Sequence, residues 1–175
     1  MERMRLALDA SLTELARLGA AVQSFGEGCG LDAKLIKTLQ LVCDEWVTNV
    51  IVHGYGGATA DGNAGATAAA TAGASGAATG AGSGEKPIEL TMERPNEETV
   101  RLTFTDGAPP FDPLARPAPD VTLPVDEREI GGLGIHFIRT LMDRCAYVRE
   151  GNYNKLVLEK RTGERGEKRN DGHSH

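Results

Sequence analysis

The chain of 175 residues has few cysteines, few aromatic residues and no long hydrophobic run. Its three cysteines, Cys29, Cys43 and Cys145, lack the spacing of a metal site, and an odd number cannot all pair within one chain. We therefore expect reduced thiols, as in a cytoplasmic protein. Cys43 falls within an apolar helical pattern and is expected to pack as a small core residue.

Features typical of membrane and nucleic-acid-binding proteins are also missing. Nothing resembles a signal peptide, and no apolar run approaches the roughly 20 residues that a membrane-spanning helix needs. Lysine and arginine number 19 against 25 acidic residues, which gives a formal net charge of −6 without any basic tract. These absences favour a cytoplasmic protein that binds neither a membrane nor nucleic acid directly.

A segment of low complexity interrupts the chain near its middle. From Gly56 to Gly84 it contains only Gly, Ala, Thr and Ser, apart from Asp61 and Asn63. Such a composition cannot bury enough apolar surface to offset the entropy cost of ordering, so we expect a flexible surface insertion. A helix through its alanines is the alternative, which the frequent glycines disfavour. We expect one domain over residues 1–161, interrupted at about 56–84, and a disordered polar tail over 162–175.

Before the insertion, hydrophobic periodicity predicts a strand and two helices. Met4–Leu8 alternates in the manner of a strand. Ser11 and Glu14 have the spacing of a capping box, and helical periodicity then continues to Phe25. A second helix is predicted from Asp32 to about His53, and the first is expected to end at Gly26, Gly28 and Gly30.

After the insertion, the pattern predicts four strands and one helix. Residues 88–92 and 100–104 alternate around Pro95-Asn96, as in a β-hairpin. Glycines introduce a helix at 131–134, and two strands are predicted at 146–149 and 156–158. The order β-α-α-β-β-α-β-β favours an α+β two-layer sandwich, with helices on one face of a mostly antiparallel sheet.

A polar stripe is predicted along the second helix. Glu45, Asn49 and His53 are four residues apart and share one face, while Trp46 and Val50 point toward the core. The amide oxygen of Asn49 is a neutral, hard ligand suited to Mg²⁺. Glu45, one turn earlier, could accept a proton from an attacking hydroxyl or water. A solvated polar face is the alternative interpretation.

Asp106 and Gly107 directly follow a predicted strand. An aspartate at this place could accept a hydrogen bond from an exocyclic amine, and the glycine would let a flat ring approach the backbone. An ordinary Asp-Gly turn is the alternative. Phe111 is expected to pack under the loop that follows.

Four residues, Gly131, Gly132, Leu133 and Gly134, precede the third predicted helix. Glycines at a helix N-terminus expose backbone N–H groups to phosphate oxygens, and the helix dipole favours the negative charge. The signal is weak by itself, because glycine clusters often serve only as turns. It is not a Walker loop, since no Gly-Lys-Ser/Thr follows.

Together, the three clusters resemble the GHKL ATPase superfamily. Asp44–Tyr55, with Glu45, Asn49 and His53 at intervals of four, resembles the N box of the anti-sigma-factor serine/threonine kinases. Asp106–Pro113 resembles that group's Asp-x-Gly-x-x-Phe-Asp-Pro, with one residue fewer between aspartate and glycine. Residues 131–143 resemble its lid and following helix, and the likeness extends from residue 4 to 161 outside the insertion.

This resemblance implies a Bergerat-type ATP-binding fold and a protein serine/threonine kinase activity. ATP would bind with Asp106 and Gly107 at the adenine, Asn49 at Mg²⁺ and residues 131–134 near the phosphates. Glu45 would be the base that prepares a serine hydroxyl. The resemblance further implies a STAS-domain anti-anti-sigma factor as substrate and a sigma factor as a second partner. It allows a homodimer, although nothing in the composition shows an interface.

Two other functions stay open at this point. The chain could be a non-catalytic module that sequesters a partner, with ATP structural or not bound. It could also be the ATPase half of a histidine kinase. That interpretation is disfavoured because His53 and His136 lie inside the ATPase pattern rather than on a preceding helical hairpin.

Overall fold

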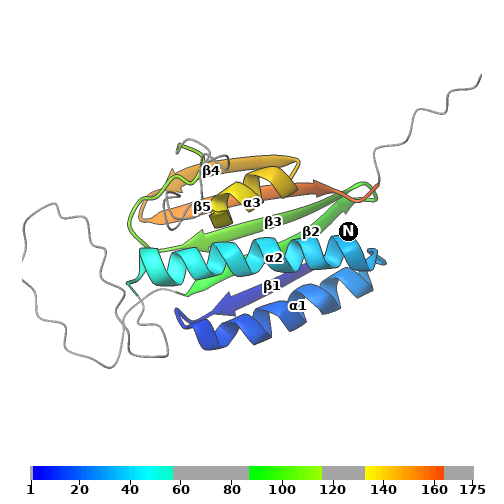
Figure 1. Ribbon diagram of the computed structural model, residues 1–175, viewed down its shortest axis with the longest axis horizontal. Coiled ribbons are helices and arrows are strands. Elements are labelled where there is room, and N and C mark those ends of the chain that lie inside the picture. The colour runs from blue at the N-terminus through cyan, green and yellow to red at the C-terminus, as the bar shows by residue number, and fades with distance from the viewer. Residues whose placement is uncertain (1, 57–86, 116–132, 164–175) are drawn as a thin grey trace, which may run out of the picture.

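The computed structural model describes residues 2–56, 87–115 and 133–163. In this part of the chain the elements follow the predicted order β-α-α-β-β-α-β-β. Three helices cover one face of a five-stranded sheet (Figure 1). The predicted α+β two-layer sandwich is therefore confirmed. The expected insertion and the expected C-terminal tail lie outside the described residues, apart from the residues at their edges.

The sheet has the strand order β1-β2-β3-β5-β4, and each neighbouring pair is antiparallel. One face of the sheet is buried and the other is not, so strands in which apolar and polar residues alternate fit this sheet. In β3, for example, Val100, Leu102 and Phe104 are fully buried and alternate with partly exposed residues. The strands are β1 (Glu2–Leu8), β2 (Ile88–Asn96), β3 (Thr99–Asp106), β4 (Arg144–Glu150) and β5 (Tyr153–Arg161).

Helix α1 (Leu15–Gly28) follows a 3₁₀ turn at Leu12–Glu14. The expected capping box is only half correct. Ser11 caps the 3₁₀ turn by accepting a hydrogen bond from Thr13 N, but the Glu14 carboxylate pairs with Arg17 instead of reaching back. The Ser11 N–H, which a capping box would offer to Glu14, donates instead to Asp9 O at 2.8 Å, and Arg17 offers the Glu14 carboxylate a charged partner one turn away.

Helix α2 (Ala33–Asn49) begins as predicted, because the Asp32 side chain accepts a hydrogen bond from Leu35 N at 2.8 Å. Its regular part ends earlier than expected. A π-helical turn at Val50–Gly54 follows, closed by a hydrogen bond from Tyr55 N to Val50 O at 2.9 Å. Single π turns inside helices are frequent at functional sites, and this one directly follows Asn49.

The core lies between the sheet and the helices. Trp46 of α2 is 2% exposed and contacts the rings of Phe104 and Phe111. The stacked Trp46–Phe111 pair confirms that Phe111 packs beneath its loop. Cys43 is fully buried, as expected. Helix α3 (Leu133–Leu141) packs beside α2 and contributes Ile138 to this core.

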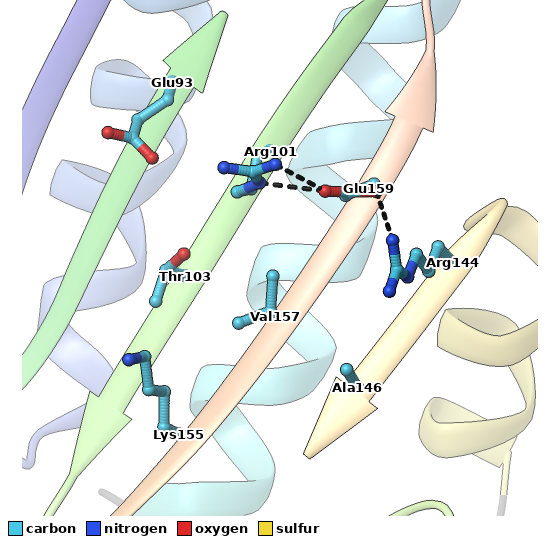
Figure 2. A pocket seen from close by; sticks show the side chains of 8 residues that line it. All are labelled: Glu93, Arg101, Thr103, Arg144, Ala146, Lys155, Val157 and Glu159. Carbon is cyan, nitrogen blue, oxygen red and sulfur yellow. Dashed lines mark hydrogen bonds and ion pairs between the residues drawn. The ribbon is translucent and has the colours of Figure 1, made fainter. Parts of the chain in front are cut away.

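The opposite face of the sheet carries no helix in the described part of the chain (Figure 1). One row of side chains with alternating charge crosses all five strands there: Arg3, Glu93, Arg101, Glu159 and Arg144. A hollow of about 410 Å³ lies on this face. Figure 2 shows the side chains that line it, among which Arg101 and Arg144 both contact Glu159. None of the described helices is long and apolar enough to cross a membrane.

Candidate functional site

Glu45 and Asn49 lie one turn apart on α2, next to the first turn of α3. The Asn49 side chain donates a hydrogen bond from Nδ2 to the Glu45 backbone oxygen at 2.7 Å. This bond fixes the amide and leaves Oδ1 without a donor among the described residues. The Glu45 carboxylate, half-buried, likewise has no hydrogen-bond or ion-pair partner within the described ranges. Both groups are thus oriented by the helix and open to a ligand.

Gly134 brings α3 into direct contact with this pair. A β-carbon built on Gly134 would collide with Glu45 Oε2 and would lie 3.1 Å from Asn49 Nδ2. Glycine therefore lets the first turn of α3 come this close to both side chains without displacing the Glu45 carboxylate. Helix N-termini favour negative charge, so phosphate groups would be stabilised here.

Asp106 ends β3 and is 1% exposed. Its Oδ1 accepts hydrogen bonds from Asn154 Nδ2 at 2.8 Å and from Ala108 N at 3.0 Å. Burial has the largest effect and raises the pKa of the Asp106 carboxyl above its ordinary value, although those two bonds and the charge of Arg149 oppose the shift. Its second oxygen, Oδ2, receives no hydrogen bond from a described residue. A buried carboxylate with one free oxygen is suited to accept a bond from a ligand.

The two parts of the site are tied together by the end of α2. Tyr55 Oη accepts a hydrogen bond from Gly107 N at 2.8 Å. A β-carbon on Gly54 would lie 2.8 Å from the Ala108 side chain, so the π turn packs closely against the loop after β3. The segment that begins at Asn49 therefore reaches the residues beside Asp106.

The structure brings together most of the residues singled out in the sequence. Glu45, Asn49 and Gly134 meet at one place, and Asp106 and Gly107 lie at the adjoining strand end. Leu133 is the first residue of α3. Gly131 and Gly132 lie outside the described residues. His53, on the same predicted stripe, is exposed within the π turn.

Three residues of the site escaped the sequence analysis: Asn154 on β5, and Tyr147 and Arg149 on β4. Asn154 is 3% exposed and contacts Asp106 directly. The only available signal was a polar residue at a position where strand alternation calls for an apolar one. Asp106 and Asn154 are the two polar residues buried in the described core, and they bind each other.

A magnesium ion would have to rely on few protein ligands. The described residues contain no group of three or more His, Cys, Asp or Glu that could hold a metal ion. The free amide oxygen of Asn49 fits Mg²⁺, which usually keeps several waters and binds phosphates. Asn49 would therefore contribute one oxygen ligand, and nucleotide phosphates and water would supply the rest.

The hollow in Figure 2 is not part of this site. Its residues Arg101 and Thr103 lie on β3 between Val100, Leu102 and Phe104, so they face away from the helices. Asp106 shares the helix-covered face with Leu102 and Phe104.

Helices on one face of an antiparallel sheet, with a buried aspartate at a strand end and polar residues beside the first turn of α3, form an α+β fold consistent with that of the GHKL ATPases. Comparison with known proteins agrees. Residues 8–160 match the histidine kinase-like ATPase domain, and the chain belongs to that family. ATP binding is the property that this family implies.

Among solved structures, the chain is similar to the RsbU and RsbW domains of Rv1364c from Mycobacterium tuberculosis. The identity is 15% and the TM-score is 0.54. The match covers 92% of this chain and 32% of that one, so the present chain spans about a third of its relative. At this identity, the likeness concerns the fold. A comparison with curated proteins gave no match.

Proposed function

We propose that this protein is an ATP-dependent serine/threonine kinase of the anti-sigma-factor type. Its substrate would be a STAS-domain anti-anti-sigma factor, and a sigma factor would be a second, sequestered partner. The observation that carries the proposal is the contact of Gly134 with both Glu45 and Asn49. It unites a free carboxylate, a free amide oxygen and a helix N-terminus in one place.

Each residue has a definite part in the proposed reaction. Asp106 would hold the adenine through its free oxygen, and Gly107 would let the ring lie against the backbone. Asn49 would hold Mg²⁺, whose charge would offset that of the phosphates. Gly134, with Gly131, Gly132 and Leu133 before it, would present backbone N–H groups to the phosphate oxygens.

Glu45 would act on the protein substrate. Its carboxylate would take the proton from a serine or threonine hydroxyl as that oxygen bonds to the γ-phosphorus and the bond to ADP breaks. The proton thus ends on Glu45 and the phosphoryl group on the substrate. A carboxylate that has no partner within the described residues is free to serve in this way.

The test compares wild type with Glu45→Gln, using γ-labelled ATP, Mg²⁺ and a lysate of the source organism. We expect a labelled protein band with wild type and none with the variant, while calorimetry gives both the same ATP affinity. Glu27→Gln is the matched control, because Glu27 is an exposed helical glutamate on α1 that contacts only Gln23 among the described side chains.

The outcomes separate the candidate functions. Labelling with wild type and Glu27→Gln alone supports the kinase and gives the substrate for identification. ATP binding without labelling by any of the three proteins would instead favour a non-catalytic, partner-sequestering module. If wild type does not bind ATP at all, the proposal is wrong.

A further inference from the structure

Asp106 belongs to a row of polar residues that crosses three adjacent strands. In the sheet register, Asp106 of β3 pairs with Asn154 of β5, and Asn154 pairs with Arg149 of β4. Asn154 is almost completely buried, at 3% exposure. Burying an amide is costly unless its hydrogen bonds are satisfied. The contacts of Asn154 therefore indicate why an apolar residue does not occupy this core position.

The Asn154 amide is held in one orientation. Its oxygen Oδ1 accepts hydrogen bonds from Tyr147 Oη at 2.7 Å and from Arg149 Nη1 at 2.8 Å. Arginine has only donors, so the amide oxygen must face Arg149. The opposite end, Nδ2, is consequently turned toward Asp106 Oδ1 at 2.8 Å, and it also reaches Ala108 O at 3.2 Å.

This orientation determines what Asp106 can offer a ligand. Oδ1 already accepts two bonds, from Asn154 Nδ2 and Ala108 N. Both donors favour the ionised carboxylate against the opposing effect of burial. The plane of the carboxylate is thereby fixed, and Oδ2 is the oxygen left to a ligand. In the ionised carboxylate, Oδ2 is an acceptor and not a donor.

We propose that Asn154 is a positioning residue that determines base specificity: it turns Asp106 Oδ2 toward the ligand as an acceptor, so that the site selects an adenine over a guanine base. Adenine presents an amino donor at its 6-position, where guanine presents an oxygen acceptor. A fixed acceptor therefore binds the first and repels the second. This inference rests on the proposed nucleotide binding at Asp106.

The direct test replaces Asn154 with leucine, which keeps the size and removes the donor. Calorimetry with Mg²⁺-ATP and Mg²⁺-GTP measures the affinity ratio. We expect the ATP affinity to fall at least about tenfold. Without Asn154, Asp106 Oδ2 is no longer held toward the adenine, and the hydrogen bond from the 6-amino group to this charged acceptor is lost. The GTP affinity should stay the same or rise, since guanine gains nothing from the Asp106 acceptor and the repulsion is relieved when that acceptor is no longer fixed.

Two further variants separate positioning from a general structural role. Tyr147→Phe removes only the hydroxyl that holds Asn154 Oδ1, and should lower the ATP:GTP affinity ratio about two- to fivefold. Asn152→Leu is the matched control, because Asn152 is exposed in the same β4–β5 hairpin. It should leave the ratio unchanged. Thermal unfolding without nucleotide checks that each variant is folded. If Asn154→Leu does not fold, the ATP:GTP affinity ratio of Tyr147→Phe alone tests whether Asn154 positions Asp106.

The outcomes distinguish this inference from the proposed function. If wild type binds ATP and the ATP:GTP ratio is the same in both folded site variants, the inference is wrong and the nucleotide site stands. If wild type binds no ATP, the proposed function fails and the base-specificity claim fails with it. The positioning of Asp106 is then tested by carbon-13 NMR titration of its carboxyl. A higher pKa in Asn154→Leu than in wild type supports the positioning, and an equal pKa overturns it.

Discussion

Gly134 is a residue whose importance lies in the atom it lacks. The side-chain end that a β-carbon would meet is Glu45 Oε2, which can move at little cost to folding. We therefore predict that Gly134→Ala leaves the melting temperature nearly unchanged and lowers phosphoryl transfer at least about tenfold, because the displaced carboxylate no longer meets the hydroxyl in line. Labelled-ATP assays and thermal unfolding measure the two effects.

The control for this prediction is Gly19→Ala on α1, where nothing lies within 4 Å of a new β-carbon. That change should leave transfer intact. Equal activity of Gly134→Ala and wild type would show that the contact with Glu45 has no role in the reaction.

Asp44 lies beside Glu45 in the sequence, and its ionised carboxylate destabilises the folded protein. Its Oδ1 is buried without a hydrogen-bond partner in the described part of the chain. Burial, and secondarily the charge of Glu45, raises the pKa of the Asp44 carboxyl above its ordinary value. Folding thus opposes ionisation, and stability falls as pH rises from the unfolded-state pKa of about 3.9 through the higher folded value.

We accordingly predict that Asp44→Asn melts a few degrees above wild type at neutral pH. The advantage should shrink as the pH falls toward about 4, where the wild-type carboxyl becomes neutral. Thermal unfolding over this pH range provides the measurement. Asp9→Asn, an exposed aspartate, serves as control. A gain that is independent of pH would contradict the explanation.

At the scale of elements, α1 and α2 pack closely because of one glycine. Gly26, Gly28 and Gly30 were together expected to end the first helix; α1 does end at Gly28, but Gly26 lies inside it and is buried. A β-carbon there would lie 2.5 Å from Ile36 Cγ1 and 2.9 Å from its Cδ1. The helix continues past Gly26 to Gly28, because packing against α2 stabilises the helical conformation by more than the low helix propensity of Gly26 destabilises it.

This packing predicts opposite effects for two glycines of the same helix. Gly26→Ala should destabilise the protein by about 1–2 kcal/mol, since overpacking Ile36 outweighs the gain in helix propensity. Gly19→Ala should stabilise it by roughly 0.5–1 kcal/mol. Urea denaturation of both variants gives the two free energies of unfolding. Stabilisation by both substitutions would show that the helices separate readily.

At the scale of the whole molecule, the two faces of the sheet differ in what covers them. One is covered by helices, and the other carries the alternating charges of Arg3, Glu93, Arg101, Glu159 and Arg144. Glu159 accepts from Arg101 Nε at 2.9 Å and Nη2 at 2.8 Å, and lies 3.9 Å from Arg144 Nη1. Both Arg101 nitrogens donate to the same oxygen, Oε1, and this charge-assisted pair is the part of the row expected to contribute to stability.

Glu159→Gln should lower the free energy of unfolding by up to about 1 kcal/mol at low salt, and by less at high salt. Urea denaturation at two salt concentrations measures this. Glu150→Gln is the matched control, because the Glu150–Lys155 pair is more exposed and makes a single contact at 3.3 Å. Its stability should be unchanged. A loss at Glu159 that is insensitive to salt would argue against an electrostatic cause.

Element order, strand alternation and the start of the second helix near Asp32 could all be predicted from the sequence, because these depend on contacts between near neighbours in the chain. The same holds for the Glu45–Asn49 pair, since residues four apart share a helix face. The predicted ends of the helices were less accurate than the predicted order of the elements. Gly26 and the π turn after Asn49 depend on packing against distant elements.

The sequence by itself thus determined the layers of the fold and the residues on each side of the proposed nucleotide site. Only the tertiary structure decided how those residues meet. Gly134 lies against Glu45, and Asn154 binds Asp106, although 89 and 48 sequence positions respectively separate the two residues of each pair. No local pattern encodes such contacts, because they arise when strands and helices align into one sheet and one covering layer.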